Sequence, residues 1–227
     1  MVLVFAVAGC KAETRTGSGG PQETGGGGAA LTAAESLTVK GRAPKTGYAR
    51  DRFGAAWADT DSNSCDTRDD ILKRDLDDVK FSDGKCKVSY GVLESDPYSG
   101  QKVTYRRGRS LVDIDHLVAL SDAWQKGAKY WDARKRIALA NDPLNLLAVD
   151  ASANRAKGDG DTATWVPPNK AYRCTYVAAQ VAVKKKYELW VTAAEKSAME
   201  KVLRTCPGQK LPSGGNPTEA PARFRAD

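Results

Sequence analysis

The order of elements between residues 111 and 159 constrains the fold more than any other feature of this sequence. Residues 112–115 alternate apolar and acidic side chains, which predicts a strand. A turn and a second β-prone run follow at 142–149, and residues 150–158 have the N-cap, helix formers and terminal glycine of a short helix. The order strand, long loop, strand, helix predicts a ββα unit over about residues 110–159.

The single histidine of the chain, His116, ends the first of these strands. Asp113 and Asp115 share one face of that strand, whereas Asp115 and His116 are adjacent and point to opposite sides while the strand is regular. We therefore expect a bend or bulge that brings Asp115 and His116 to one site. Asp113 either supports that site or is an exposed strand residue.

The remaining patterns predict one helix-rich domain over residues 31–206. Helical spacing of apolar residues and strand-like alternation around turn formers define the other elements. They are helices over 68–79, 131–140 and 172–204, and a β-hairpin with strands at 86–92 and 102–108. The last helical stretch is either one helix or two that break near Trp190. The expected fold class is α+β, a helix-rich single domain around a ββα core with a short β-hairpin.

The N-terminus is typical of an exported bacterial protein. Residues 2–9 are apolar but too few to span a bilayer, as at the end of a signal sequence. The Val-Ala-Gly tripeptide before Cys10 resembles a lipobox, so we expect residues 1–10 to be a signal and Cys10 to be lipidated, unless cleavage occurs elsewhere. Residues 11–30 are poor in large apolar side chains and predict a flexible linker. Residues 207–227, rich in Pro, Gly and charge, predict a flexible tail.

Four further cysteines lie within the domain: Cys65, Cys86, Cys174 and Cys206. An even number in an exported chain predicts two disulfides. Three connectivities are open, and the local pairs Cys65–Cys86 and Cys174–Cys206 need the least chain reversal. A zinc site is the weaker interpretation, because no CxxC pair exists and the histidine is far from all four in sequence.

The charge balance favours an anionic partner. The chain has 35 Lys and Arg against 28 Asp and Glu, a net charge of +7. Nucleic acid and anionic envelope polymers are the leading candidates, and a solvated basic surface without a partner is the alternative.

The segment Asp113-Ile114-Asp115-His116, followed by Asn145 and Asn154, resembles the HNH, or ββα-metal, endonucleases. The run Asn154-Arg155-Ala156-Lys157 adds to this resemblance. The stretch from about residue 48 to residue 206 is similar to the secreted bacterial branch of that superfamily, the GmrSD C-terminal type. Asn154 stands where many members have a metal-binding histidine.

The resemblance implies a role for each motif residue. His116 would be the general base, Asp115 and Asn154 would hold one divalent cation, and Asn145 would brace the loop and orient the His116 ring. Hard oxygen ligands suit Mg²⁺, with Mn²⁺ as the alternative, better than zinc. A neutral imidazole, with an ordinary pKa of about 6.5, suits a base near pH 7.

Three cationic side chains are candidates for contacting substrate phosphates. Arg155 and Lys157 lie within one helical turn of Asn154, and Arg109 leads into the motif strand. Lys157 could equally be a solvated helix end.

The leading interpretation is an exported, metal-dependent endonuclease that cuts DNA rather than RNA with little sequence specificity. We expect an extracellular or cell-surface location, contact with the membrane only through a lipid anchor, and a monomer by default. The alternative is a noncatalytic surface lipoprotein that binds DNA or anionic wall polymer through a basic face.

Overall fold

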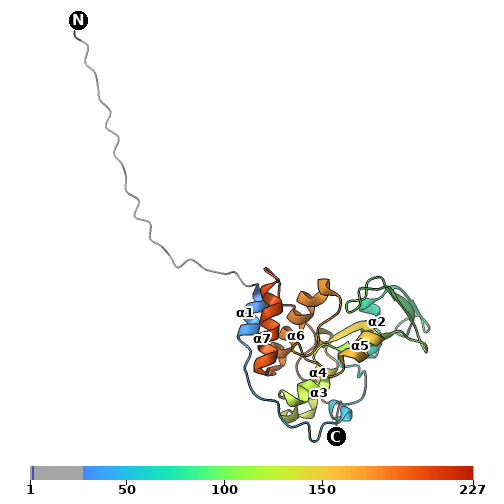
Figure 1. Ribbon diagram of the computed structural model, residues 1–227. Helices are drawn as coiled ribbons and strands as arrows, with labels where there is room; N and C mark the ends of the chain where they lie inside the picture. The colour runs from blue at the N-terminus through green and yellow to red at the C-terminus, as the bar shows by residue number, and fades with distance from the viewer. Residues whose placement is uncertain (1, 3–27, 227) are drawn as a thin grey trace.

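Two short antiparallel strands and the helix that follows them form the centre of the fold (Figure 1). Strand β4 (Val112–His116) pairs with β5 (Leu146–Asp150), from Val112 opposite Asp150 to His116 opposite Leu146. Helix α5 (Ala151–Lys157) begins directly after β5. The predicted order of strand, loop, strand and helix is therefore present.

The computed structural model describes Val2 and residues 28–226. Cys10 and nearly all of the predicted signal and linker lie outside the described residues. None of the helices in this described part is long and apolar enough to cross a membrane.

A three-stranded antiparallel sheet in the order β1-β2-β3 lies beside the ββα unit. Its strands are β1 (Asp77–Phe81), β2 (Val88–Leu93) and β3 (Val103–Arg106). Strands β2 and β3 form the predicted hairpin, with Tyr90 opposite Arg106 and Leu93 opposite Val103.

The helix predicted over 68–79 is shorter than expected. Helix α2 (Thr67–Asp75) ends where Leu76 adopts an extended backbone, and residues 77–81 form β1 instead. Pairing with β2 supplies the backbone of Asp77, Lys80 and Phe81 with partners on the neighbouring strand. Tertiary pairing thus overrides the local helical spacing.

Helices cover the remaining faces of the core. They are α1 (Ala29–Glu35), α3 (Leu120–Gln125), α4 (Ala133–Ala140), α6 (Arg173–Tyr187) and α7 (Ala193–Arg204), with 3₁₀ turns at Arg50–Phe53 (η1), Ala128–Tyr130, Pro143–Asn145 and Lys170–Tyr172. The chain breaks between α6 and α7 around Trp190, at the predicted position. Helix α1 lies against α6 and α7, so the domain begins before residue 31 (Figure 1).

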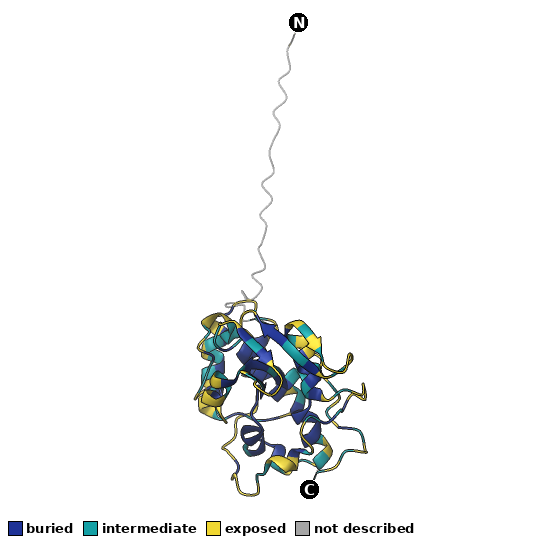
Figure 2. Ribbon diagram, turned by 90° about the vertical axis from the view of Figure 1, so that its right-hand side faces the viewer, coloured by how far each residue is buried: buried dark blue, intermediate teal, exposed yellow. Residues whose placement is uncertain are grey.

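The buried residues lie between the helices and the two sheets (Figure 2), and most of them are apolar. One cluster joins α1, α6 and α7, a second joins α3 and α4 to α6, and a third joins α2 to both sheets. The ββα unit is thereby supported on several sides by packed helices.

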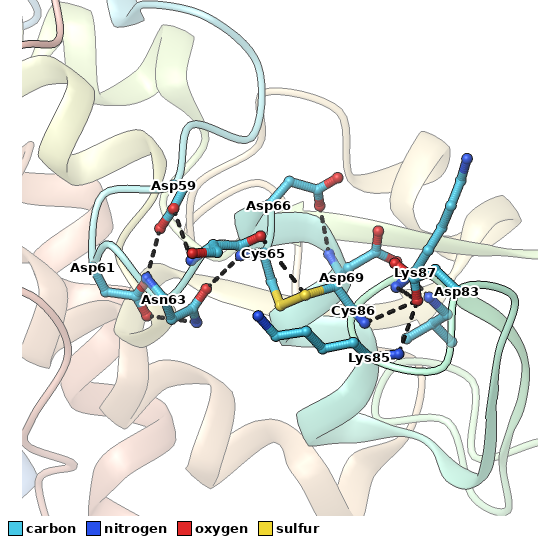
Figure 3. The surroundings of a disulfide bond; sticks show 12 residues. Asp59, Asp61, Asn63, Cys65, Asp66, Asp69, Asp83, Lys85, Cys86 and Lys87 are labelled. Carbon is cyan, nitrogen blue, oxygen red and sulfur yellow. Dashed lines mark hydrogen bonds between the residues drawn. A yellow bond between two sulfur atoms is a disulfide. The ribbon is translucent and has the colours of Figure 1, made fainter.

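The structure contains both local disulfides, Cys65–Cys86 and Cys174–Cys206. The first joins the loop before α2 to the loop between β1 and β2 (Figure 3). Asp83 holds the second of these loops, because its carboxylate accepts hydrogen bonds from the backbone N–H groups of Lys85, Cys86 and Lys87 (Figure 3).

The segment predicted as a flexible tail lies against the domain as far as it is described. The Lys186 ammonium donates to the carbonyl oxygens of Gly214 and Asn216, at 3.0 and 2.5 Å. Arg134 donates to the carbonyl of Ala220, whose side chain is buried in the cluster of α3, α4 and α6. Backbone carbonyls, which composition does not reveal, hold this segment in place.

Candidate active site

A pocket of about 240 Å³ lies at the C-terminal end of β4 and is lined by Asp115, His116 and Asn154 together. Strand β4 supplies the first two residues and α5 supplies the third. The other lining residues are Tyr48, Arg50, Ile114, Ala119, Leu120, Gly158 and Asp159. Three residues of the predicted motif therefore meet in one concave site.

The bend or bulge expected near His116 is absent, because the pairing of β4 with β5 is regular as far as His116 and Leu146. His116 is the last residue of the strand, and its ring lines two neighbouring pockets at once. Asp115 lines one of these two pockets. The two side chains reach the same site because His116 separates the two pockets and lines both, while the strand itself stays regular.

The His116 ring has a defined orientation. Its Nε2 lies 2.9 Å from the carbonyl oxygen of Ala140 at the end of α4. A carbonyl can only accept a hydrogen bond, so Nε2 carries the proton in the neutral ring and Nδ1 has a free lone pair. The Trp57 ring lies nearly parallel, with 6.1 Å between ring centroids and 13° between planes.

Burial lowers the pKa of His116 from 6.5 to about 3, although the hydrogen bond to Ala140 opposes this effect. The positive charges of Arg50 and Lys157 lower the pKa further. The imidazole is therefore neutral at pH 7, as expected, but its pKa lies well below the ordinary value assumed from sequence.

Asp115 is buried, and both of its carboxylate oxygens have partners. One oxygen accepts from the Tyr98 hydroxyl at 2.5 Å, and the other accepts from the Lys157 ammonium at 2.9 Å. Burial raises the pKa of Asp115, and the contacts with Lys157 and Tyr98 oppose that rise. No sequence pattern pointed to Tyr98, which lies in the turn between β2 and β3.

Lys157 does not occupy the position of a solvent-facing phosphate contact. Its side chain is fully buried, and its ammonium also donates to the backbone carbonyl of His116 at 2.9 Å. Lys157 therefore ties α5 to the end of β4 and holds the Asp115 carboxylate in place.

Asp113 contacts Asn154. The Asn154 amide nitrogen donates to the Asp113 carboxylate at 3.3 Å, which sets the orientation of the amide. Among residues 28–226, the Asn154 Oδ1 accepts no side-chain hydrogen bond. Asp113 is therefore placed to orient the oxygen that the resemblance assigns to metal binding.

Asn145 braces the loop after β4. Its Oδ1 accepts from the backbone N–H of Val118 at 2.8 Å, and its Nδ2 donates to the carbonyls of Val118 and Leu139 at 3.4 and 3.3 Å. Its own carbonyl accepts from the N–H of Leu117 at 2.8 Å. The His116 ring is held instead by the hydrogen bond that its Nε2–H donates to the Ala140 carbonyl.

The exposed cation at the pocket is Arg50, in η1. Arg50 lines the pocket and forms no salt bridge within residues 28–226. Arg155 and Arg109 are also exposed, but neither lines the pocket. Arg109 precedes β4 at its far end, and a five-residue strand separates its two ends by about 13 Å.

The donor set of the pocket suits a hard divalent cation. Asp115 offers a carboxylate whose oxygens already accept from Tyr98 and Lys157. Asn154 offers an amide oxygen, and Asp159, which pairs with Lys45, adds a second carboxylate on the pocket wall. The described residues contain no group of three or more His, Cys, Asp or Glu that could hold a metal. A cation here would therefore have few protein ligands and several waters, as Mg²⁺ commonly does.

Comparison with known proteins identifies the family to which the segment around this pocket belongs. The C-terminal domain of GmrSD restriction endonucleases matches residues 66–202, a range that includes β4, β5 and α5. An uncharacterized secreted protein of Arthroderma benhamiae is 44% identical over 172 residues, which cover 75% of this chain and 81% of that protein. No solved structure matches the chain significantly. The chain belongs to the family of GmrSD restriction endonuclease C-terminal domains, as the Asp-His and paired-asparagine pattern predicted.

Proposed function

We propose that this protein is an exported, metal-dependent endonuclease that hydrolyses phosphodiester bonds, in DNA rather than RNA and with little sequence specificity. The observation that carries the proposal is the meeting of Asp115, His116 and Asn154 in one pocket. The family supports nuclease chemistry, and the net charge of +7 supports a polyanionic substrate.

His116 acts as the general base. Its Nδ1 accepts a proton from the water that attacks the phosphorus, while the Nε2–H bond to Ala140 keeps the ring in position. The resulting imidazolium is stabilised by the same carbonyl. A phosphodiester bound beside Arg50 counters the positive charge that lowers the pKa of His116, so substrate binding strengthens the base.

Asp115 and Asn154 would hold one divalent cation, Mg²⁺ or Mn²⁺, which would stabilise the charge that develops on the phosphate and on the leaving oxygen. Tyr98 and Lys157 fix the Asp115 carboxylate, and Asp113 fixes the Asn154 amide. These contacts preorganise the two ligands before substrate binds.

Arg50 takes the phosphate-binding role that the sequence suggested for Lys157. It is exposed, lines the pocket and lacks an acidic partner in the described range, so its guanidinium is free for a phosphate. Arg109 and Arg155 would contact phosphates further along the backbone, since they are exposed but lie outside the pocket.

Cleavage of plasmid DNA tests the proposal. Wild-type protein should produce nicked and linear product with Mg²⁺ or Mn²⁺ and none with EDTA. His116→Ala should lower the rate by roughly 10²–10⁴, the usual contribution of a general base. Lys201→Ala, an exposed cation on α7 that lines neither pocket, serves as the control, with circular dichroism to verify folding. Wild-type rates for His116→Ala would refute the assignment.

The same assay separates the alternative of a noncatalytic DNA-binding or wall-polymer-binding protein. That alternative predicts salt-sensitive binding without product under either metal. It also predicts that Asn154→Ala changes nothing, whereas a metal-binding role predicts that this variant needs more Mg²⁺ for half-maximal rate.

Export is supported by the related protein, which is named a secreted protein, and by the two disulfides. Lipidation of Cys10 would place the enzyme at the cell surface, with the linker holding it clear of the membrane. Metabolic labelling with a fatty-acid analogue, with Cys10→Ser as the control, tests this attachment.

A further inference from the structure

A second cavity of about 240 Å³ adjoins the candidate active site. His116, Arg50 and Leu120 line both, so the two cavities share one wall. The second cavity is bounded otherwise by the segment from Asp51 to Trp57 and by the C-terminal end of α4 at Ala140 and Asn141. Its occupant would therefore lie directly beside the group that the first cavity acts upon.

The walls of the second cavity are mainly apolar, and they include aromatic rings. The rings of Trp57 and His116 lie 13° from parallel, and Phe53 and Leu120 contribute further apolar surface. Cavities that enclose a whole drug-sized ligand measure roughly 300–1,000 Å³. A cavity of about 240 Å³ therefore suits one planar ring system that belongs to a larger ligand.

Asn141, a residue of the cavity wall, carries a polar atom without a partner. Asn141 is 1% exposed, and its Oδ1 has no hydrogen-bond partner in the described part of the chain. Its Nδ2 is already used, because it donates to the carbonyl of Ile137 at 3.0 Å. A buried acceptor without a donor is costly, so this atom indicates a ligand with an N–H group.

Trp57 is held in an unusual backbone conformation. Its φ is +60°, in the left-handed region that a bulky side chain seldom adopts. Its carbonyl accepts from the N–H of Thr67 at the start of α2, which fixes the turn. Strained positions of this kind occur frequently where a side chain serves a ligand.

We propose that the second cavity binds one nucleobase of the substrate, from the nucleotide next to the scissile phosphate. This inference rests on the proposed nuclease function. A nucleobase is a planar ring system with N–H donors, so it matches both the Trp57 ring and the Asn141 Oδ1. Arg50 lines both cavities, so its guanidinium would contact a phosphate of the nucleotide whose base lies in the second cavity.

A base of a duplex must unstack from its neighbouring bases before it can enter this cavity. Turning a base out of a duplex costs a few kcal/mol, and the cost is least for an unpaired strand. The enzyme therefore binds single-stranded or locally unpaired nucleic acid more tightly than regular duplex. Cleavage of plasmid then occurs preferentially where the duplex opens.

Binding without catalysis tests this site separately from the nuclease activity. The full-length protein in EDTA is titrated into three fluorescent probes of equal length, namely single-stranded DNA, the same backbone with abasic residues, and duplex DNA. Anisotropy should show at least tenfold tighter binding to the single strand than to the abasic strand. Equal affinity for these two probes would overturn the proposal, and this comparison needs only the wild-type protein.

Variants of Trp57 identify the stacking partner. Trp57→Asn removes the ring and tolerates positive φ, and it should weaken single-strand binding about 5- to 150-fold, the usual loss of one aromatic–base stack. Trp57→Phe should restore most of this affinity. Trp190→Asn, in the break between α6 and α7, is the matched control and should change affinity less than twofold. Unchanged affinity in Trp57→Asn would overturn the assignment.

The outcomes distinguish the two proposals. Base-dependent binding without cleavage under Mg²⁺ or Mn²⁺ would refute the proposed function and leave the base site standing. Cleavage with equal affinity for intact and abasic strands would refute the base site and leave the nuclease standing.

Discussion

Replacing Glu195 with glutamine perturbs the most deeply buried group of charges in the described structure. Three cations and three carboxylates meet there, from α3, α6, α7, the loop after α5 and the loop after α1, which supplies the partly exposed Arg42. They are Arg42, Lys126 and Lys184, with Asp122, Asp161 and Glu195. The Glu195 carboxylate lies 2.5 Å from the Lys126 ammonium and 3.0 Å from that of Lys184, and all three side chains are fully buried.

The magnitude follows from the charge balance. The group is neutral as a whole, and Glu195→Gln leaves three cations with two carboxylates. Removing one partner of a buried ion pair costs roughly 3–5 kcal/mol, because the other charge remains in the interior without compensation. For a domain of 150–250 residues, 1 kcal/mol shifts Tm by about 2–4 °C, so Tm should fall by about 6–20 °C.

Urea unfolding at pH 7 with the disulfides intact measures this loss of free energy. Glu200→Gln is the matched control on the same helix, because Glu200 pairs with the exposed side chain of Arg204. A surface pair of this kind contributes about 0.3–0.5 kcal/mol. The double variant Lys184→Met with Glu195→Leu removes a cation and an anion together and should recover most of the lost stability. A loss below about 1 kcal/mol for Glu195→Gln would refute the reasoning from buried-pair energetics.

Three other predictions follow from the charges described above. Burial opposes ionisation of Asp122, but the ammonium groups of Lys184 and Lys126 outweigh it and lower the pKa of Asp122 from 3.8 to about 2. A carboxylate whose pKa is lower in the folded protein stabilises the fold at pH values above its unfolded pKa. On the order of 2 kcal/mol of unfolding free energy should therefore be lost as the pH falls from the unfolded pKa of 3.8 to the folded pKa of about 2. Urea midpoints that do not change over this pH range would contradict the prediction. The sole imidazole, that of His116, should show the NMR shifts of the neutral Nε2–H form from pH 8 to pH 5, because its pKa is about 3, and a titration midpoint near the ordinary value would disprove the burial argument. Lys157→Met should lower the free energy of unfolding by roughly 3–5 kcal/mol, since it leaves buried Asp115 without its counter-ion, whereas a change in KM alone, with unaltered stability, would restore Lys157 as a phosphate contact.

The elements of the ββα unit were predictable because their signals are local. Alternation identified β4, and the N-cap Asp150 with the terminal glycine identified α5. The boundary of α2 was not predictable in the same way, since residues 77–81 continue the helical spacing but pair with β2. Helix α1 was also absent from the prediction, because its alanine-rich sequence follows a glycine-rich run and gains its burial from α6 and α7.

The residues of the candidate site likewise include some that the sequence predicted and some that it did not. Asp115, His116 and Asn154 lie within one motif, and the resemblance to the HNH endonucleases implied that they meet. Arg50 and Tyr98 reach the pocket or its carboxylate from segments that are distant in sequence and have no distinctive pattern. The role of Lys157 depends on its burial, which spacing alone does not determine, because the same helix position could face solvent.

The pairing of the four cysteines in the domain bears on how the chain acquires its native covalent structure. Each cysteine is joined to its nearest neighbour in sequence, across separations of 21 and 32 residues. Neither loop encloses or crosses the other. A chain that enters an oxidising compartment N-terminus first therefore presents each partner before the next pair arrives. We expect oxidation in that order to form the native pairs directly, without exchange of crossed intermediates.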